Sequence, residues 1–173
     1  MNAVTTTLPA VGPALPTFAS VAESELDSVY RYLVCLTGDH ATAEDLTGET
    51  FEKAFRAWRR FDPRRGSARA WLCGIARGAA LDHFRSERRR RRREERYARE
   101  DGAAAEPAIG NTVVGEALRQ LSPAEREVVA LRVLLDLDGP TTARVLGISR
   151  TACSTRLSRA LKRLEEMMID ARV

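Results

Sequence analysis

The stretch PTTARVLGISRTACSTRLSRALK, residues 140–162, determines how the C-terminal part of the chain folds. Pro140 begins a short helix, and Gly147 permits the positive φ that a tight turn between two helices needs. Ser149 then caps a second helix that runs to about Ile169. The pattern predicts a helix–turn–helix, with small Ala143 at the contact between the helices. The expected core face of the second helix consists of Cys153, Leu157, Ala160, Leu161 and Leu164.

The opposite face of this second helix carries cations and hydroxyl groups. Five basic residues and no acidic residue lie between Ser149 and Arg163. Short hydroxyl donors and arginines suit contacts with base edges in the major groove and with backbone phosphates. We therefore favour DNA binding, and an ordinary helical hairpin with a basic surface is the alternative. The outward residues are Arg150, Thr151, Ser154, Thr155, Ser158 and Arg159.

Two segments lead into the helix–turn–helix. Residues 100–112, EDGAAAEPAIGNT, have the glycine, proline and acidic content of a flexible linker. Ser122-Pro123-Ala124-Glu125 is a capping box with proline at the first helical position, which predicts that a helix begins there. The apolar stripe of that helix consists of Val128, Leu131 and Leu135.

The N-terminal part of the chain has helical patterns and no alternating strand pattern. Residues 1–19 contain three prolines, four threonines and no charge, which predicts a flexible tail. We expect helices over residues 21–37 and 41–60, a loop over residues 61–67, and a third helix that begins near Ser67. The buried stripe of the second of these helices consists of Phe51, Ala54, Phe55 and Trp58.

These patterns predict an all-α fold of two small helical domains joined by a flexible linker. The first domain spans residues 20–99, and the second, which contains the helix–turn–helix, spans residues 113–173. A chain of 173 residues has room for two such domains.

The positive charge of the chain is concentrated in one run. The formal net charge is +4, and the segment RSERRRRRREERYAR, residues 85–99, contains nine arginines and three glutamates. Without this segment, which carries a net +6, the chain has a net charge of −2. Such asymmetry suggests a nucleic acid or an anionic surface as partner, and a solvated helix end is the alternative.

Several classes of protein are excluded by composition. No apolar run approaches the roughly 18 residues of a membrane span, so we expect no membrane insertion. A secretory signal begins with a positively charged segment, but the first 20 residues contain no Lys or Arg. Three widely spaced cysteines fit a reducing cytoplasm. Neither histidine has metal-ligand spacing, and there is no glycine-rich phosphate loop, so we expect no cofactor, no metal and no enzymatic activity.

Three motifs in order resemble the bacterial sigma factors of the extracytoplasmic-function (ECF) group. They are GDHATAEDLTGETFEKAFRAWRRF (residues 38–61), ARAWLCGIARGAALDHFR (68–85), and LSPAEREVVALRVLLDLDGPTTARVLGIS (121–149) leading into TRLSRALKRL (155–164). The resemblance covers residues 22–168. It implies a factor that directs core RNA polymerase to promoters and opens their −10 element.

The resemblance also implies roles for particular residues. An acidic helix would bind core RNA polymerase through Asp45, Gly48, Glu49 and Glu52. The −10 element, held as single-stranded DNA, would contact Asp62, Arg64, Arg65, Ser67, Trp71, Arg77, His83, Arg85, Arg88 and Arg89. The −35 element would contact Arg150, Thr151, Ser154, Thr155, Arg156 and Arg159. The family is often held inactive by an anti-sigma protein, which makes one a plausible partner alongside polymerase and promoter DNA.

A few positions depart from the family pattern. Gly48 stands where a polymerase-contacting glutamine is usual, and Gly78 where asparagine is common. Thr142 replaces an isoleucine and leaves a hydroxyl near the core. Ser154 replaces a lysine and removes one cation, while Cys153 at a valine position reads as a small buried hydrophobe.

Two other functions stay open at this point. The chain could be a helix–turn–helix regulator that binds DNA without acting with core polymerase, as the departures at Gly48 and Ser154 suggest. It could also be an interaction protein whose arginine run binds RNA or an acidic protein.

Overall fold

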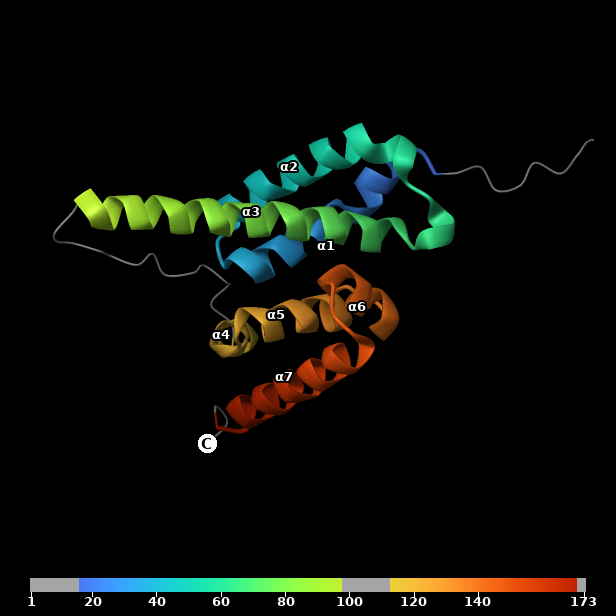
Figure 1. Ribbon diagram of the computed structural model, residues 1–173. Helices are drawn as coiled ribbons and strands as arrows, with labels where there is room; N and C mark the ends of the chain where they lie inside the picture. The colour runs from blue at the N-terminus through green and yellow to red at the C-terminus, as the bar shows by residue number, and fades with distance from the viewer. Residues whose placement is uncertain (1–15, 98–112, 171–173) are drawn as a thin grey trace, which may run out of the picture.

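A computed structural model describes residues 16–97 and 113–170, and the secondary structure within those ranges is entirely helical (Figure 1). The first unit consists of α1 (Phe18–Thr37), α2 (His40–Ala57) and α3 (Ala68–Tyr97), with the short 3₁₀ turns η1 (Trp58–Arg60) and η2 (Pro63–Arg65) before α3. The second unit consists of α4 (Val113–Gln120), α5 (Pro123–Val129), the π-helical segment η3 (Ala130–Leu134), α6 (Gly139–Leu146) and α7 (Arg150–Asp170). The all-α prediction is confirmed.

The first helix begins earlier than expected. The hydroxyl of Thr17 accepts a hydrogen bond from the backbone N–H of Ser20 at 3.2 Å, so α1 starts at Phe18. The expectation that the tail extends to residue 19 is therefore wrong for its last residues, and residues 1–15 lie outside the described part. The sequence missed this start because Thr17 follows a proline-rich segment that carries no helical periodicity.

Helix α2 differs from its prediction at one buried position and at its end. Ala54 is fully buried and Phe51 and Trp58 are half-buried, as expected, but Phe55 is 65% exposed. Its ring lies at the edge of the buried stripe, 5.2 Å from the ring of Phe18. The α-helix ends at Ala57 because residues 58–60 tighten into the 3₁₀ turn η1.

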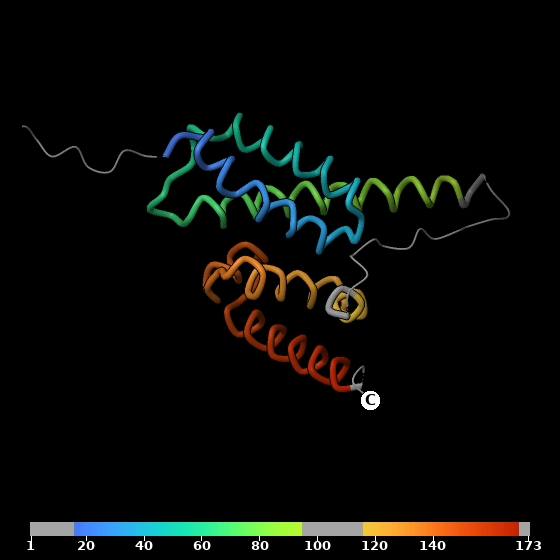
Figure 2. Tube along the Cα trace, turned by 180° about the vertical axis from the view of Figure 1, so that it is seen from behind, coloured from blue at the N-terminus to red at the C-terminus, as the bar shows by residue number. Residues whose placement is uncertain are grey.

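Helix α3 is packed along its first half and exposed along its second. Its start near Ser67 is confirmed, because the Ser67 hydroxyl accepts from the backbone N–H of Ala70 at 3.2 Å. Five residues from Leu72 to Ala80 are buried, and none of the residues from Leu81 to Glu94 is. The second half therefore extends beyond the body of the molecule, as Figures 1 and 2 show from opposite sides.

The second unit follows the sequence prediction closely. The capping box of Ser122 and Glu125 is complete, and Gly147 adopts a left-handed conformation with φ 67° between α6 and α7. Cys153 and Ala160 are buried, whereas Leu161 is 44% exposed, so its assignment to the core face is wrong. Leu161 lies one residue past the centre of the stripe, at the edge of the face on which α4, α5 and α6 pack against α7.

The two units pack against each other. Helix α1 contacts α5 and η3, and α3 contacts α6, while α7 lies on the side away from the first unit (Figures 1 and 2). Buried apolar residues of both units form one continuous cluster. The predicted linker, residues 100–112, lies outside the described residues. None of the described helices combines the length and the apolar character that a membrane span requires.

Candidate nucleic-acid interface

One face of α7 carries the residues that the sequence assigned to duplex DNA. Arg150, Thr151, Ser154, Thr155 and Arg159 are exposed, and Arg156 is half-buried. Ser149 caps the helix by accepting from the N–H of Ala152 at 3.1 Å. This arrangement presents guanidinium and hydroxyl donors side by side at the N-terminal half of a helix, as major-groove reading requires.

A hollow of about 610 Å³ separates this face from the start of α5. Glu125 lines the hollow and forms an ion pair with Arg163 at 2.9 Å. The pKa of the Glu125 carboxyl lies below its usual range because Ser122 donates to it, with further help from Arg163 and Arg156. Glu125, the one acid among the residues that line the hollow, is thus held as a paired anion, and the rest of the lining consists of hydroxyl residues, two alanines and two arginines.

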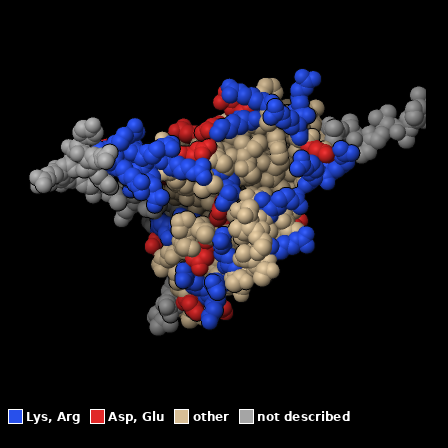
Figure 3. All heavy atoms as spheres, in the orientation of Figure 1, with Lys and Arg blue, Asp and Glu red and all other residues tan. Residues whose placement is uncertain are grey.

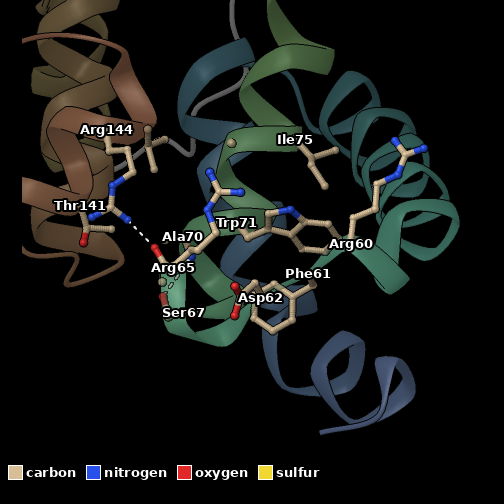
Figure 4. A pocket seen from close by; sticks show the side chains of 13 residues that line it. Arg60, Phe61, Asp62, Arg65, Ser67, Ala70, Trp71, Ile75, Thr141 and Arg144 are labelled. Atoms are coloured by element: carbon tan, nitrogen blue, oxygen red, sulfur yellow. Dashed lines mark hydrogen bonds between the residues drawn. The ribbon is translucent and has the colours of Figure 1, made fainter. Parts of the chain in front are cut away.

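The loop between α2 and α3 borders a second cavity, of about 410 Å³ (Figure 4). Phe61 and Trp71 line it, with ring centroids 5.3 Å apart, and Trp58 stacks on Phe61 at 4.9 Å. The guanidinium groups of Arg60 and Arg65 flank these rings. Aromatic faces beside cations suit a stacked, unpaired base and its phosphate.

Asp62 fixes the shape of this loop. Its carboxylate accepts from the backbone N–H of Arg64 at 3.1 Å and from the Arg64 guanidinium at 3.0 Å. These hydrogen bonds hold the pKa of Asp62 below its usual value. Asp62 and Arg64 are therefore engaged with each other, and Asp62 lines the cavity together with Arg65 and the exposed Ser67.

The second unit closes one side of the same cavity. Arg144 of α6 donates from Nη1 to the backbone carbonyl of Arg65 at 2.7 Å, shown as a dashed line in Figure 4. Thr141 and Val145 complete that wall. Sequence reasoning missed Arg144, because an exposed arginine on a short helix carries no signal of a partner 79 residues away.

A buried hydrogen-bond network also joins the two units. Glu127 of α5 is 9% exposed, and its Oε1 accepts from the hydroxyl of Tyr32 at 3.1 Å and from Nε of Arg77 at 2.8 Å. Burial, and then the neighbouring Glu127 charge, raises the pKa of Tyr32 well above its usual value. Arg69 adds a second link, donating to Glu25 at 2.7 Å and to the carbonyl of Leu135 at 3.3 Å.

This network engages a residue that the resemblance assigned to DNA. In the observed arrangement Nε of Arg77 is bonded to Glu127 rather than facing solvent, and the side chain is 27% exposed. Sequence reasoning missed Glu127, although a signal existed: an acid one turn before Leu131 lies on the apolar face of its helix.

The remaining residues of the predicted −10 set lie along α3. His83 is half-buried, with its ring 5.8 Å from that of Phe84. Arg85 forms an ion pair with Asp82 at 3.0 Å. Arg88 and Arg89 are exposed on the extended half of the helix.

The predicted polymerase-facing residues share one exposed side of α2. Glu49 pairs with Lys53 and Glu52 with Arg56, whereas no cation of the described chain lies within ion-pair distance of Asp45. Acidic side chains gather over this helix in Figure 3. A Cβ added at Gly48 would meet nothing within 4 Å, so this surface has room for the larger residue that the family pattern expects.

Candidate metal ligands do not gather in the described residues: no three of His, Cys, Asp and Glu there lie close enough to hold an ion. The departures at Thr142 and Cys153 are accommodated in the core. Thr142 is fully buried and its hydroxyl donates to the carbonyl of Leu137 at 3.4 Å, while Cys153 is 2% exposed.

The family comparisons define the class of protein. Residues 21–90 match sigma-70 region 2, and residues 112–164 match sigma-70 region 4. The cavity and its loop lie in the first match, and the helix–turn–helix lies in the second.

Similarity to individual proteins identifies one group within this class. The chain is 35% identical over 160 residues to the ECF RNA polymerase sigma factor BldN of Streptomyces coelicolor, covering 88% of this chain and 61% of that protein's length. It is 34% identical over 154 residues to the ECF RNA polymerase sigma factor SigC of Mycobacterium tuberculosis, covering 86% of this chain and 80% of the relative. The chain belongs to the ECF sigma factors of RNA polymerase.

Solved structures share the arrangement of both units. The sigma factor RpoE in complex with the anti-sigma factor NepR from Bartonella quintana matches with a TM-score of 0.74 and 25% identity, over 87% of this chain and 96% of that one. CnrH in complex with the cytosolic domain of CnrY matches with a TM-score of 0.65 and 26% identity, over 90% and 89%.

Proposed function

We propose that this sigma factor brings core RNA polymerase to specific promoters and opens their −10 element when transcription begins. The observation that carries the proposal is the cavity lined by Phe61 and Trp71 beside the loop of residues 61–67. A base removed from the duplex can stack on such rings, and each stacked base contributes about 1–3 kcal/mol. Arg60 and Arg65 provide cations for the adjoining phosphates.

Each of the two units binds one element of the promoter in this proposal. We assign the −10 element to residues 20–99 and the −35 element to residues 113–173. The exposed cations and hydroxyls of α7 support the second assignment, because guanidinium and hydroxyl donors can read base edges while neighbouring arginines hold phosphates. Ser154 supplies a hydroxyl where the family pattern has a cation, which favours a different base preference over a loss of binding.

The acidic side of α2 is the proposed docking surface for core polymerase. Asp45 carries the greatest weight there, because Glu49 and Glu52 are already paired with cations of their own helix. An unpaired exposed carboxylate attracts a basic partner surface without first breaking an existing ion pair. Because RNA polymerase works in the cytoplasm, the proposed function implies the same compartment for this protein.

An anti-sigma protein is the proposed negative regulator. The support is that RpoE and CnrH, which resemble this chain over both units, were solved with NepR and CnrY respectively. Such a partner would bind the chain in the arrangement observed here, in which the two units are in contact.

The test is reconstitution with sigma-free core polymerase on promoters identified by mapping transcript starts after induction. We expect specific transcripts from the wild-type protein and reduced core affinity for Asp45→Arg. Asp27→Arg is the control, because Asp27 is also an exposed acid and lies on α1, away from the proposed docking surface. Absence of core binding by the wild-type protein would refute the proposal.

The same experiment separates this function from a helix–turn–helix regulator. A regulator that acts without polymerase would bind duplex DNA strongly in the absence of core, and changes at Asp45 and Glu49 would leave its activity unaltered. The observation that favours this alternative is Gly48, which offers no side chain to polymerase in the middle of the docking surface.

A further inference from the structure

The cavity beside the loop of residues 61–67 has a wall that the proposed function does not use. Thr141, Arg144 and Val145 of α6 form this wall, although the second unit is assigned to the −35 element. A base captured from the −10 element needs only the rings and cations of the first unit. The wall from α6 adds a second side, and the resulting pocket of about 410 Å³ falls within the range of about 300–1,000 Å³ typical of small-molecule sites.

Three guanidinium groups line this pocket without a carboxylate partner. Arg60, Arg65 and Arg144 form no ion pair with any residue of the described chain. Asp62, the one acid among the lining residues, accepts from Nε and Nη2 of Arg64 at 3.0 and 3.2 Å. Because Arg64 compensates the charge of Asp62, the three lining guanidinium groups remain available for an anion.

Arg144 is positioned by the backbone of the first unit rather than by an acid. Its Nη1 donates to the carbonyl of Arg65 at 2.7 Å, and this bond uses one of the five N–H donors of a guanidinium group. Gly66 permits the approach: a Cβ there would lie 3.3 Å from Nη1 of Arg144, and φ is 153°, a value that residues with side chains rarely adopt. The guanidinium group is therefore held at the pocket with donors to spare.

The apolar part of the lining suits a flat ring. Trp58 already stacks on Phe61 at 4.9 Å with an interplanar angle of 14°, so the indole of Trp71 is the ring left for a ligand. In the view of Figure 4, this indole lies between the guanidinium groups of Arg65 and Arg60. A heterocyclic base packed against Trp71 would therefore have cations beside it for any phosphates that it carries.

We propose that this pocket binds a free purine nucleoside di- or triphosphate, with the base against Trp71 and the phosphates held by Arg65 and Arg144. An apolar ligand would leave three cations unmatched, and inorganic phosphate would leave the rings unused. The hydroxyls of Ser67 and Thr141, which also line the pocket, are further donors for phosphate or ribose oxygens.

Binding of this nucleotide has a consequence for promoter opening. The proposed function assigns the same rings to an unpaired base of the −10 element, so a free nucleotide and the single strand exclude each other. This consequence rests on the proposed function, whereas the nucleotide site itself does not.

The first experiment measures ligand affinity by isothermal titration calorimetry of the isolated full-length protein. The probes are ATP, adenosine, which lacks the phosphates, and tripolyphosphate, which lacks the base and ribose. We expect ATP to bind at least tenfold more tightly than either of the other two. Equal affinity for ATP and tripolyphosphate would overturn the role of Trp71, and equal affinity for ATP and adenosine would overturn the role of the arginines.

Variants then locate the site. Arg144→Gln should weaken ATP binding about tenfold, because one charge-assisted hydrogen bond to phosphate is lost. Gly66→Ala should act in the same direction by displacing Arg144. Arg31→Gln is the control, because Arg31 is an exposed arginine on α1 that does not line the pocket. Wild-type affinity in Arg144→Gln, or an equal loss in Arg31→Gln, would overturn the site, since the attraction would then be diffuse.

The second experiment tests exclusion of the single strand. Fluorescence anisotropy follows a labelled 12-nucleotide strand that carries the mapped −10 element. ATP at ten times its own Kd should raise the apparent Kd of the strand about elevenfold, as simple competition requires. In Arg144→Gln about ten times more ATP should be needed. An unchanged strand affinity at saturating ATP would contradict a shared pocket.

These readouts separate the two proposals. Calorimetry needs neither polymerase nor DNA, so failure of ATP to bind refutes the nucleotide site alone. Failure of the wild-type protein to bind core polymerase refutes the proposed function and leaves the ATP affinity as measured. Arg144 belongs to neither set of assigned promoter contacts, so Arg144→Gln holoenzyme should open a mapped promoter as the wild type does without nucleotide. Loss of opening would give Arg144 a role on DNA and overturn its assignment to the nucleotide.

Discussion

The two halves of α3 carry the same residue type in opposite surroundings. In the packed half, Arg69 and Arg77 each donate to a carboxylate and help to join the two units. In the extended half, the six arginines of residues 88–93, which we call the arginine arm, have few partners and cover no core. The comparison teaches that an arginine on this helix is structural or available for a ligand according to what the neighbouring elements offer. The position of an arginine within an arginine-rich sequence does not determine which of these two roles it has.

The largest effect is expected when an arginine of the packed half of α3 is removed. Arg77→Ala leaves the Glu127 carboxylate buried with only the Tyr32 hydroxyl as donor. We expect the free energy of unfolding to fall by about 2 kcal/mol, because a buried charge without its counter-ion is strongly unfavourable. Urea unfolding measures this. A loss below about 0.5 kcal/mol, as for a surface ion pair, would mean that the network contributes no stability.

The packed half of α3 also contains a glycine at which a side chain could be added without a clash. Gly78 lies in the interior of the helix, and an added Cβ there would meet nothing within 4 Å. Gly78→Ala should therefore raise the free energy of unfolding by about 1 kcal/mol, the helix-propensity difference between the two residues. Thermal unfolding would reveal a lowered midpoint if the backbone there needed the freedom of glycine.

Neutralising the extended half should have a smaller effect of the same sign. Five arginines of the arm have no ion-pair partner among the described residues: Arg88, Arg89, Arg91, Arg92 and Arg93. Replacing them with glutamine removes like-charge repulsion and no packing, so we expect a gain of about 0.5 kcal/mol. A clear loss of stability in urea would show that the arm packs against the protein in solution, which would weaken the contrast between the halves.

The pH dependence of stability distinguishes the packed interface from the arm. Burial raises the pKa of Tyr32 well above its usual value, and it raises those of Cys35 and Cys73 to about 11 and about 12. Each group is neutral when folded and ionises more readily when unfolded. Their contribution is therefore complete below the unfolded pKa values and is lost as pH rises through and above them.

Unfolding followed by circular dichroism between pH 8 and 11 would record this loss. Tyr32→Phe should flatten part of the decline, whereas the glutamine variant of the arm should leave it unaltered, because arginine does not titrate there. If the free energy of unfolding declined equally with pH in the wild type and in Tyr32→Phe, ionisation of the Tyr32 hydroxyl would not be a cause of the decline.

Local signals were enough to predict much of the fold. The capping box at Ser122, the cap at Ser67 and the left-handed Gly147 all follow from interactions within four residues along the chain, and each was correct. The exposed face of α7 followed from helical spacing in the same way. These features depend on backbone geometry and periodicity, which the sequence displays directly.

The failures concern residues whose surroundings depend on distant elements. Phe55 and Leu161 have the spacing of core residues, yet each lies at the edge of its stripe where no further element covers it. The links made by Glu127 and Arg144 join positions 50 or more residues apart and required the packing of the two units to be known. The pairing of Arg77 could not be separated from a DNA-binding role for the same reason.

The measurement that tests the central claim most directly is permanganate reactivity of thymines at a mapped promoter bound by the reconstituted holoenzyme. With the wild-type protein we expect reactive thymines in the −10 element, and with Trp71→Ala we expect bound but largely unreactive DNA. Full thymine reactivity in a Trp71→Ala, Phe61→Ala variant, or no opening by a wild-type holoenzyme that binds the promoter, would contradict the assignment of the cavity to an unpaired base.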